Sequence, residues 1–123
     1  MNSTLLMVAT LMLVVVTIFH AVMGQKILIS PMLRERAGLM NDEMPRKIIQ
    51  FSWQAQTVLM ALPALYLALV AFDQTEGSAI MVAAIGLSFF GMGLANGMMT
   101  RFRHPGGFLL GGAGLLILLA LYI

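Results

Sequence analysis

Four long apolar blocks limit what this chain can fold into. They cover Thr4–Met23, Ile48–Phe72, Ala79–Met99 and Gly107–Ile123, and each reaches or approaches the ~17–25 residues that cross a bilayer as a helix. The sequence is 60% hydrophobic and 10% charged, whereas a soluble domain carries roughly 25% charged residues on its surface. A membrane-spanning barrel strand would alternate apolar and polar residues, which these blocks do not. The sequence therefore predicts an all-α, polytopic membrane protein, a four-transmembrane-helix bundle forming a single transmembrane domain, 1–123.

The basic residues indicate the orientation of this bundle. They are Lys26, Arg34, Arg36, Arg46 and Lys47 in the first connection, and Arg101 and Arg103 in the third. The second connection carries Asp73 and Glu76 but no Lys or Arg. Because basic loops stay in the cytoplasm, we expect a cytoplasmic loop over 24–47 and both termini in the periplasm. This arrangement describes a multi-pass protein of the bacterial inner membrane.

The loop over 24–47 is the largest piece outside the predicted spans. Pro31 should end or kink any helix that continues into it from the first span. Two interpretations remain open for the rest of the loop. It is either a short amphipathic segment on the cytoplasmic membrane surface or a solvated connection.

A polar cluster is predicted near the cytoplasmic ends of the first three spans. His20 lies about one turn before the end of the first block, Gln54 lies in the first turns of the second, and Asn96 lies one turn before the end of the third. Because consecutive spans run in opposite directions, these three residues share a depth within roughly one turn, ~5.4 Å. Thr17 shares a helix face with His20, and Thr57 shares one with Gln54. The candidate cluster consists of Thr17, His20, Gln54, Thr57 and Asn96.

This cluster has two interpretations. It is a proton-handling or ligand-binding site, because histidine titrates near neutral pH and ionisable residues inside membranes are often functional. Alternatively, its side chains only satisfy one another between helices. Near it, Trp53, Arg101 and Arg103 are expected at the membrane interface, where aromatic and basic residues gather.

Small residues predict how the last two spans pack. Glycine lets two helix backbones approach closely in a membrane, so we expect a tight hairpin between the third and fourth spans. A contact between copies of the chain is the alternative. The candidate packing residues are Gly86, Gly93, Gly97, Gly107 and Gly111.

Several kinds of chemistry are unsupported by the sequence. The absence of cysteine excludes disulfides and zinc–thiolate sites. No span carries a carboxylate, in contrast to the small multidrug exporters, and no nucleotide-binding or HExxH motif occurs. We therefore predict no enzyme and no cofactor, with haem b on His20 as a minor alternative. The basic residues adjoin membrane segments, which favours lipid over nucleic acid as their partner.

The first half of the chain resembles a family of small bacterial four-helix integral membrane proteins of uncharacterised activity. The stretches "FHAVMGQKILISPML" and "RKIIQFSWQAQT" carry the resemblance. The residues that match the family pattern are His20, Gly24, Gln25, Lys26, Phe51 and Trp53, with Gln25 standing where an acid is common. The resemblance implies a membrane-embedded four-helix fold and no particular activity.

Three functions are compatible with these features. The favoured one is a non-enzymatic accessory or partner subunit of a membrane complex, because little of the chain lies outside the membrane. The second is a homo-oligomeric channel or transporter with a polar path through His20, Gln54 and Asn96. The third is an electron-transfer subunit that binds haem or quinone. The expected partners are the lipid bilayer and either other membrane subunits or further copies of the chain.

Overall fold

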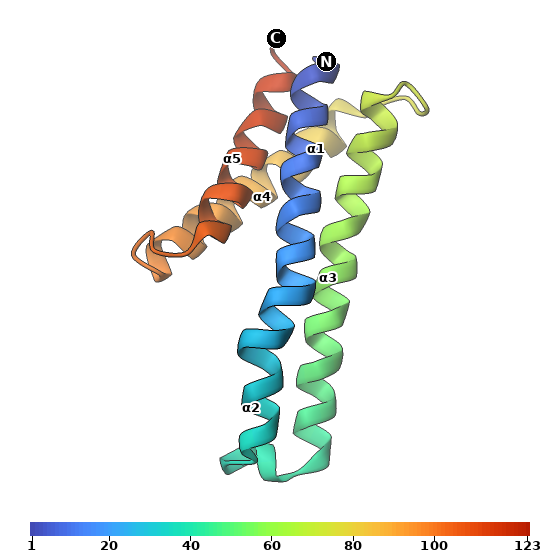
Figure 1. Ribbon diagram of the computed structural model, residues 1–123. Helices are drawn as coiled ribbons and strands as arrows, with labels where there is room; N and C mark the ends of the chain where they lie inside the picture. The colour runs from blue at the N-terminus through green and yellow to red at the C-terminus, as the bar shows by residue number, and fades with distance from the viewer.

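The structure, a computed structural model, describes residues 1–123 and is entirely helical. Its elements are α1 (Ser3–Ile18), the π-helix η1 (Phe19–Ile29), α2 (Ser30–Glu35), the short 3₁₀ helix η2 (Gly38–Asn41), α3 (Glu43–Ala71), α4 (Ala79–Met99) and α5 (Pro105–Ala120). Figure 1 shows two hairpins of unequal length. One pairs the α1–η1–α2 rod with α3, and the other, made of α4 and α5, lies beside only the upper half of the first. The all-α prediction is confirmed.

Three of the helices have the length and composition of membrane spans. They are the continuous rod Ser3–Glu35, α3, and α4, while α5 is apolar but has only 16 residues. At ~1.5 Å per residue, α5 is about 24 Å long, somewhat short of the ~30 Å hydrocarbon core of a bilayer. These lengths are those of a membrane protein.

The segment predicted as a loop over 24–47 is mostly helical, which corrects the expected helix bounds. The first rod does not stop at Met23 but continues to Glu35, where Arg36 takes a left-handed conformation with φ 47°. Pro31 does not end the rod, and it stands where the π-helix η1 passes into α2. At its other end, the connection gives way to α3 at Glu43, before the predicted start at Ile48.

The hydrophobic core occupies only the half of the molecule where both hairpins meet. α5 packs between α4 and α1, and α1 packs between α5 and α3. The core residues on the long hairpin end at Val16 on α1 and begin at Met60 on α3. Beyond that level Ile29 is the one buried hydrophobic residue. The upper half is therefore a four-helix packing unit, and the lower half is a two-helix hairpin.

Glycines bring α4 and α5 into close contact. Gly93 is buried, and a Cβ added there would overlap with the backbone of Gly111 and lie 2.8 Å from the Gly107 carbonyl oxygen. Gly114 is packed in the same way against Phe90. Of the candidate packing residues, those that are buried are Gly86, Gly93, Gly97 and Gly107, and Gly111 is half-buried.

Candidate functional site: a polar seam between η1 and α3

The His20 ring stacks on the indole of Trp53 where the long hairpin leaves the four-helix unit. Their ring centroids are 4.0 Å apart and the ring planes differ by 12°. The His20 Nε2 lies 3.4 Å from the Trp53 carbonyl oxygen, so the tautomer that carries the proton on Nε2 can donate a hydrogen bond to it. Gly24, one turn further on, makes room for the indole, because a Cβ there would overlap with Trp53.

Below this stack, a group of amide side chains joins the two arms of the hairpin. Gln25 and Gln50 exchange hydrogen bonds, each amide nitrogen donating to the other's oxygen at 3.2 Å. Gln54 donates to the same Gln25 oxygen at 3.0 Å, and the Gln25 amide nitrogen also donates to the Ser30 hydroxyl at 3.2 Å. We refer to His20, Trp53, Gln25, Gln50, Gln54 and Ser30 as the polar seam. Gln25 is its centre, since it makes all four of the amide hydrogen bonds.

The π-helical geometry of η1 explains why these side chains share one face. In an α-helix the hydrogen bond joins residues four apart, whereas in a π-helix it joins residues five apart. Residues at five-residue spacing are therefore neighbours along η1, and His20, Gln25 and Ser30 have this spacing. The Gln25–Ser30 hydrogen bond is a direct instance. An ordinary α-helix would turn Gln25 away from His20 and away from α3.

The two candidate threonines are satisfied within their own helices. The Thr17 hydroxyl donates to the Leu13 carbonyl oxygen at 2.7 Å. The Thr57 hydroxyl lies 3.3 Å from the Trp53 carbonyl oxygen, which is also the oxygen that faces His20. Thr57 is thus linked to the polar seam through that carbonyl. The indole N–H of Trp53 is buried and has no hydrogen-bond partner.

Asn96 lies apart from the polar seam. It is on α4, where its side-chain oxygen is buried without a hydrogen-bond partner and faces Gly107 of α5. No hydrogen bond joins it to His20 or Gln54. The structure therefore places His20 and Gln54 in the polar seam and Thr57 beside it, has Thr17 one turn before His20 on the rod, and leaves Asn96 in the other hairpin.

The sequence interpretation did not place Gln25, Gln50 and Ser30 in a shared site. Gln50 was recognisable from its position on the same face of α3 as Gln54, and Gln25 from its place in the family pattern. Their pairing needs a helix that continues past Gly24, which the sequence did not predict. Arg101 and Arg103 are exposed in the turn between α4 and α5, and His104 begins α5 by accepting a hydrogen bond from the Gly106 N–H at 3.1 Å.

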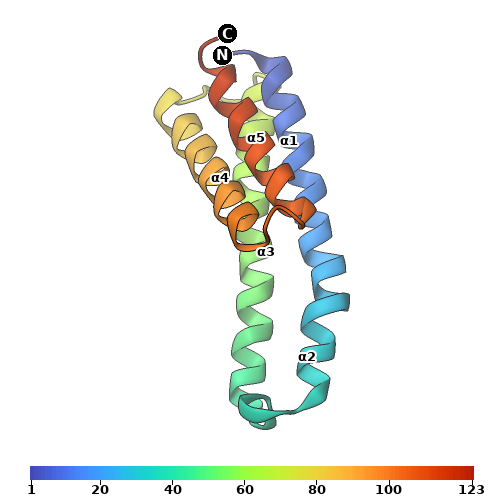
Figure 2. The same ribbon diagram turned by 90° about the vertical axis from the view of Figure 1, so that its left-hand side faces the viewer.

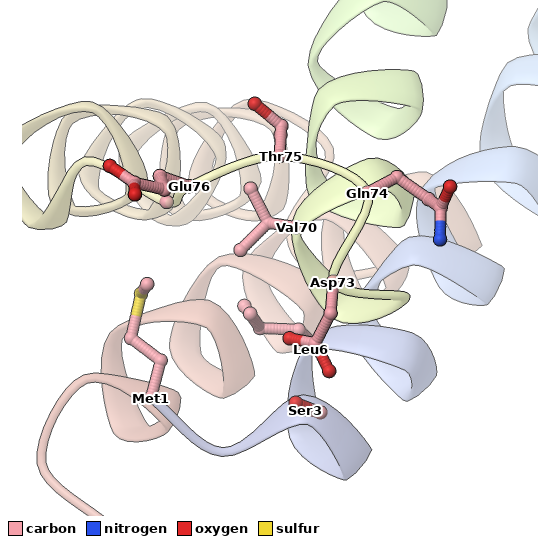
Figure 3. A pocket seen from close by; sticks show the side chains of 9 residues that line it. Met1, Ser3, Leu6, Val70, Asp73, Gln74, Thr75 and Glu76 are labelled. Atoms are coloured by element: carbon pink, nitrogen blue, oxygen red, sulfur yellow. The ribbon is translucent and has the colours of Figure 1, made fainter.

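Two hollows lie elsewhere on the molecule. A cavity of about 530 Å³ opens between the start of α1 and the connection from α3 to α4. In Figure 3 the Asp73 side chain lies near Leu6 and Ser3, while Glu76 lies at the far side of the connection, so the two carboxylates do not converge. No group of three or more His, Asp or Glu side chains is arranged to hold a metal ion.

The second hollow, of about 500 Å³, lies at the opposite end of the molecule. It is lined by residues of α2 and of the start of α3. Its lining residues are Leu33, Glu43, Arg46, Lys47, Gln50, Phe51 and Gln54.

Comparisons with protein-family models, curated proteins and solved structures gave no match to this chain.

Proposed function

We propose that the chain is a four-span, multi-pass protein of the bacterial inner membrane, with both termini in the periplasm. Its role is that of a non-enzymatic accessory subunit that holds another membrane protein through the lower half of the long hairpin. The distribution of all seven basic residues between that end and the α4–α5 turn supports the orientation. Membership of the four-helix family that the first half of the chain resembles is part of the same proposal.

The depth markers on the two hairpins agree with this placement. α1 and α5 are antiparallel neighbours, and a Cβ at Gly112 would meet Met12. Seven residues lead from there to Pro105 on α5 and to Phe19 on the rod, so the count places the α4–α5 turn level with the His20–Trp53 stack. Figure 2 shows this turn about half-way down the long hairpin. Tryptophan and arginine both favour the membrane interface. From Ser3 to His20 the rod is about 27 Å long, close to the ~30 Å hydrocarbon core.

The observation that carries the proposal is an apolar surface on the lower half of the hairpin. There η1 exposes Val22, Ile27 and Leu28, with 68% of Ile27 accessible. In this placement they lie on the cytoplasmic side of the hydrocarbon core. A contiguous exposed apolar patch outside the membrane core marks an interaction surface. α4 and α5 cover the upper half of the same hairpin. A partner helix packed on the lower half would cover its exposed apolar side chains in the same way.

Purification of the tagged chain in a mild detergent tests the proposal. A second membrane protein should co-purify in a fixed ratio, and Ile27→Asp should remove it because a carboxylate would be buried in the contact. Leu39→Asp is the matched control, since Leu39 is 75% exposed but lies on η2, away from the η1 surface. A fixed homo-oligomer without a second protein would support the channel alternative. Release of the partner by both variants would place the contact elsewhere.

A further inference from the structure

The hollow lined by α2 and the start of α3 combines basic, amide and apolar side chains in one place. Along α3, Arg46, Gln50 and Gln54 follow a four-residue spacing, which aligns them on one helix face. Phe51 on α3 and Leu33 on α2 add apolar surface beside this stripe. Phe51 is 74% exposed. The arrangement is that of a polar lining with an apolar edge.

The side chains that line the hollow carry a net positive charge, and one of the basic side chains has no ionic partner in the chain. Lys47 forms an ion pair with Glu43 at 2.7 Å, between two well-exposed side chains. Arg46 is half-buried, and its guanidinium makes no ion pair or hydrogen bond within the chain. An arginine presents five N–H donors in a fixed fork that suits a phosphate. The hollow therefore offers one unengaged guanidinium, with a lysine next to it.

The hollow also stands at the right depth for a lipid head group. Counting along α3 from Trp53 at ~1.5 Å per residue, Gln50 lies about 4.5 Å and Arg46 about 10 Å further out. The head-group layer occupies roughly 5–7 Å beyond each side of the hydrocarbon core, so Gln50 lies at its level and the Arg46 backbone lies just beyond its outer edge. The exposed ring of Phe51 lies on the membrane side of Arg46.

We infer that this hollow binds the phosphate of an anionic phospholipid from the cytoplasmic leaflet. The Arg46 guanidinium donates two parallel hydrogen bonds to the phosphate oxygens. Lys47 stays paired with Glu43, so Arg46 supplies the net positive charge, and Phe51 and Leu33 contact the glycerol and the first methylenes of the acyl chains. The inference rests on the proposed orientation in the membrane but not on the proposed protein partner. A free phosphate has the same chemistry, but the depth of the hollow favours lipid.

The test is the melting temperature of the purified chain in a neutral detergent. Phosphatidylglycerol, phosphatidylcholine and inorganic phosphate are each added in a concentration series. Phosphatidylglycerol should raise the melting temperature, because a ligand that binds the folded state stabilises it, and the other two should not. Arg46→Gln should weaken the effect about tenfold in lipid concentration. Arg103→Gln removes the same charge from the exposed α4–α5 turn and should leave the effect unchanged.

Each other outcome overturns the inference. Equal stabilisation by both lipids would show that the head group is not recognised, and an equal effect of inorganic phosphate would make a soluble phosphate the ligand. If Arg46→Gln does not fold, native mass spectrometry of the unaltered chain in an equimolar mixture of the two lipids decides, and equal retention of both contradicts the inference. All of these measurements use the isolated chain. Failure to co-purify a protein partner therefore leaves them unaffected.

Discussion

Gln25 and Gln50 exchange two hydrogen bonds of 3.2 Å between the arms of the long hairpin, beyond the core residues Val16 and Met60. At this level the hairpin has no hydrophobic core. Paired amides are directional, unlike apolar contacts, so this pair fixes which residues of η1 face which residues of α3. The register of the lower hairpin therefore depends on a few polar side chains, and that dependence can be measured.

Replacing Gln25 with alanine should loosen the lower hairpin without unfolding the rest. The change leaves the Gln50 and Gln54 amides without their shared partner, at a cost of about 1 kcal/mol for groups that water can partly reach. Amide hydrogen exchange should accelerate in η1 and α2 and stay unchanged in α4 and α5. Gln56→Ala is the matched control, because Gln56 is exposed and makes no side-chain hydrogen bond. Equal acceleration in both variants would contradict the role assigned to Gln25.

Adding a methyl group at Gly93 should destabilise the α4–α5 hairpin. Gly93→Ala would force a Cβ into the Gly111 backbone, and overpacking of this kind costs about 1–3 kcal/mol. The expected result is a lower melting temperature in detergent. Gly91→Ala is the control on the same helix, where a Cβ would meet open space, and it should hold or raise stability because alanine favours helix over glycine by about 1 kcal/mol. Equal melting temperatures for the two variants would show that the helices can separate freely.

A methyl group at Gly24 should displace the indole of Trp53 from its stack on His20. A Cβ there overlaps with the indole ring, so the ring has to move out of its present position. Trp53 is the one tryptophan in the chain, so the emission maximum of intrinsic fluorescence reports on it alone. Gly24→Ala should shift this maximum, while Gly91→Ala should not. An unshifted maximum would mean that the backbone of η1 moves instead of the ring.

The proposed orientation predicts where reporter fusions will be active. Fusions after Gly77 and at the C-terminus should report the periplasm. The start of α4 and the end of α5, which both lie far from Arg101, are on that side in this orientation. A fusion in η2, next to the basic end of the long hairpin, should report the cytoplasm. A cytoplasmic signal at Gly77 would reverse the orientation, and with it the depth argument for the lipid site.

Local sequence properties predicted the helices well, because apolar length is a property of each segment alone. The predicted third span and α4 share the bounds Ala79–Met99, and the fourth span overlaps α5 except at its ends. The helical stretch from Gly24 to Glu35 was missed. Gly24, Pro31 and the nearby charges are ordinary loop signals. The helix nevertheless continues through them: Gly24 accommodates Trp53, and Pro31 stands where η1 passes into α2.

The site was only partly predictable for a different reason. Depth in a membrane can be counted along a sequence, and this count groups His20, Gln54 and Asn96 at one level without saying which helices are neighbours. The neighbours of a helix are a property of the whole fold. Because α5 packs between α1 and α4, Asn96 faces Gly107 instead of the polar seam. The π-helical register that turns Gln25 toward Gln50 has no recognised signal in the sequence.

The hydrogen bonding of η1 has a consequence for how the chain tolerates changes in length. Each of its hydrogen-bonded rings contains one residue more than the corresponding ring of an α-helix. Loss of one residue from Phe19–Ile29 can therefore close an α-helical turn and leave the following helix in place. The same deletion inside α3 would rotate everything on one side of it by roughly 100° about the helix axis and turn Gln50 or Gln54 away from η1. The two arms of the hairpin thus differ in their tolerance of a one-residue deletion: η1 can absorb it without rotating the following helix, and α3 cannot.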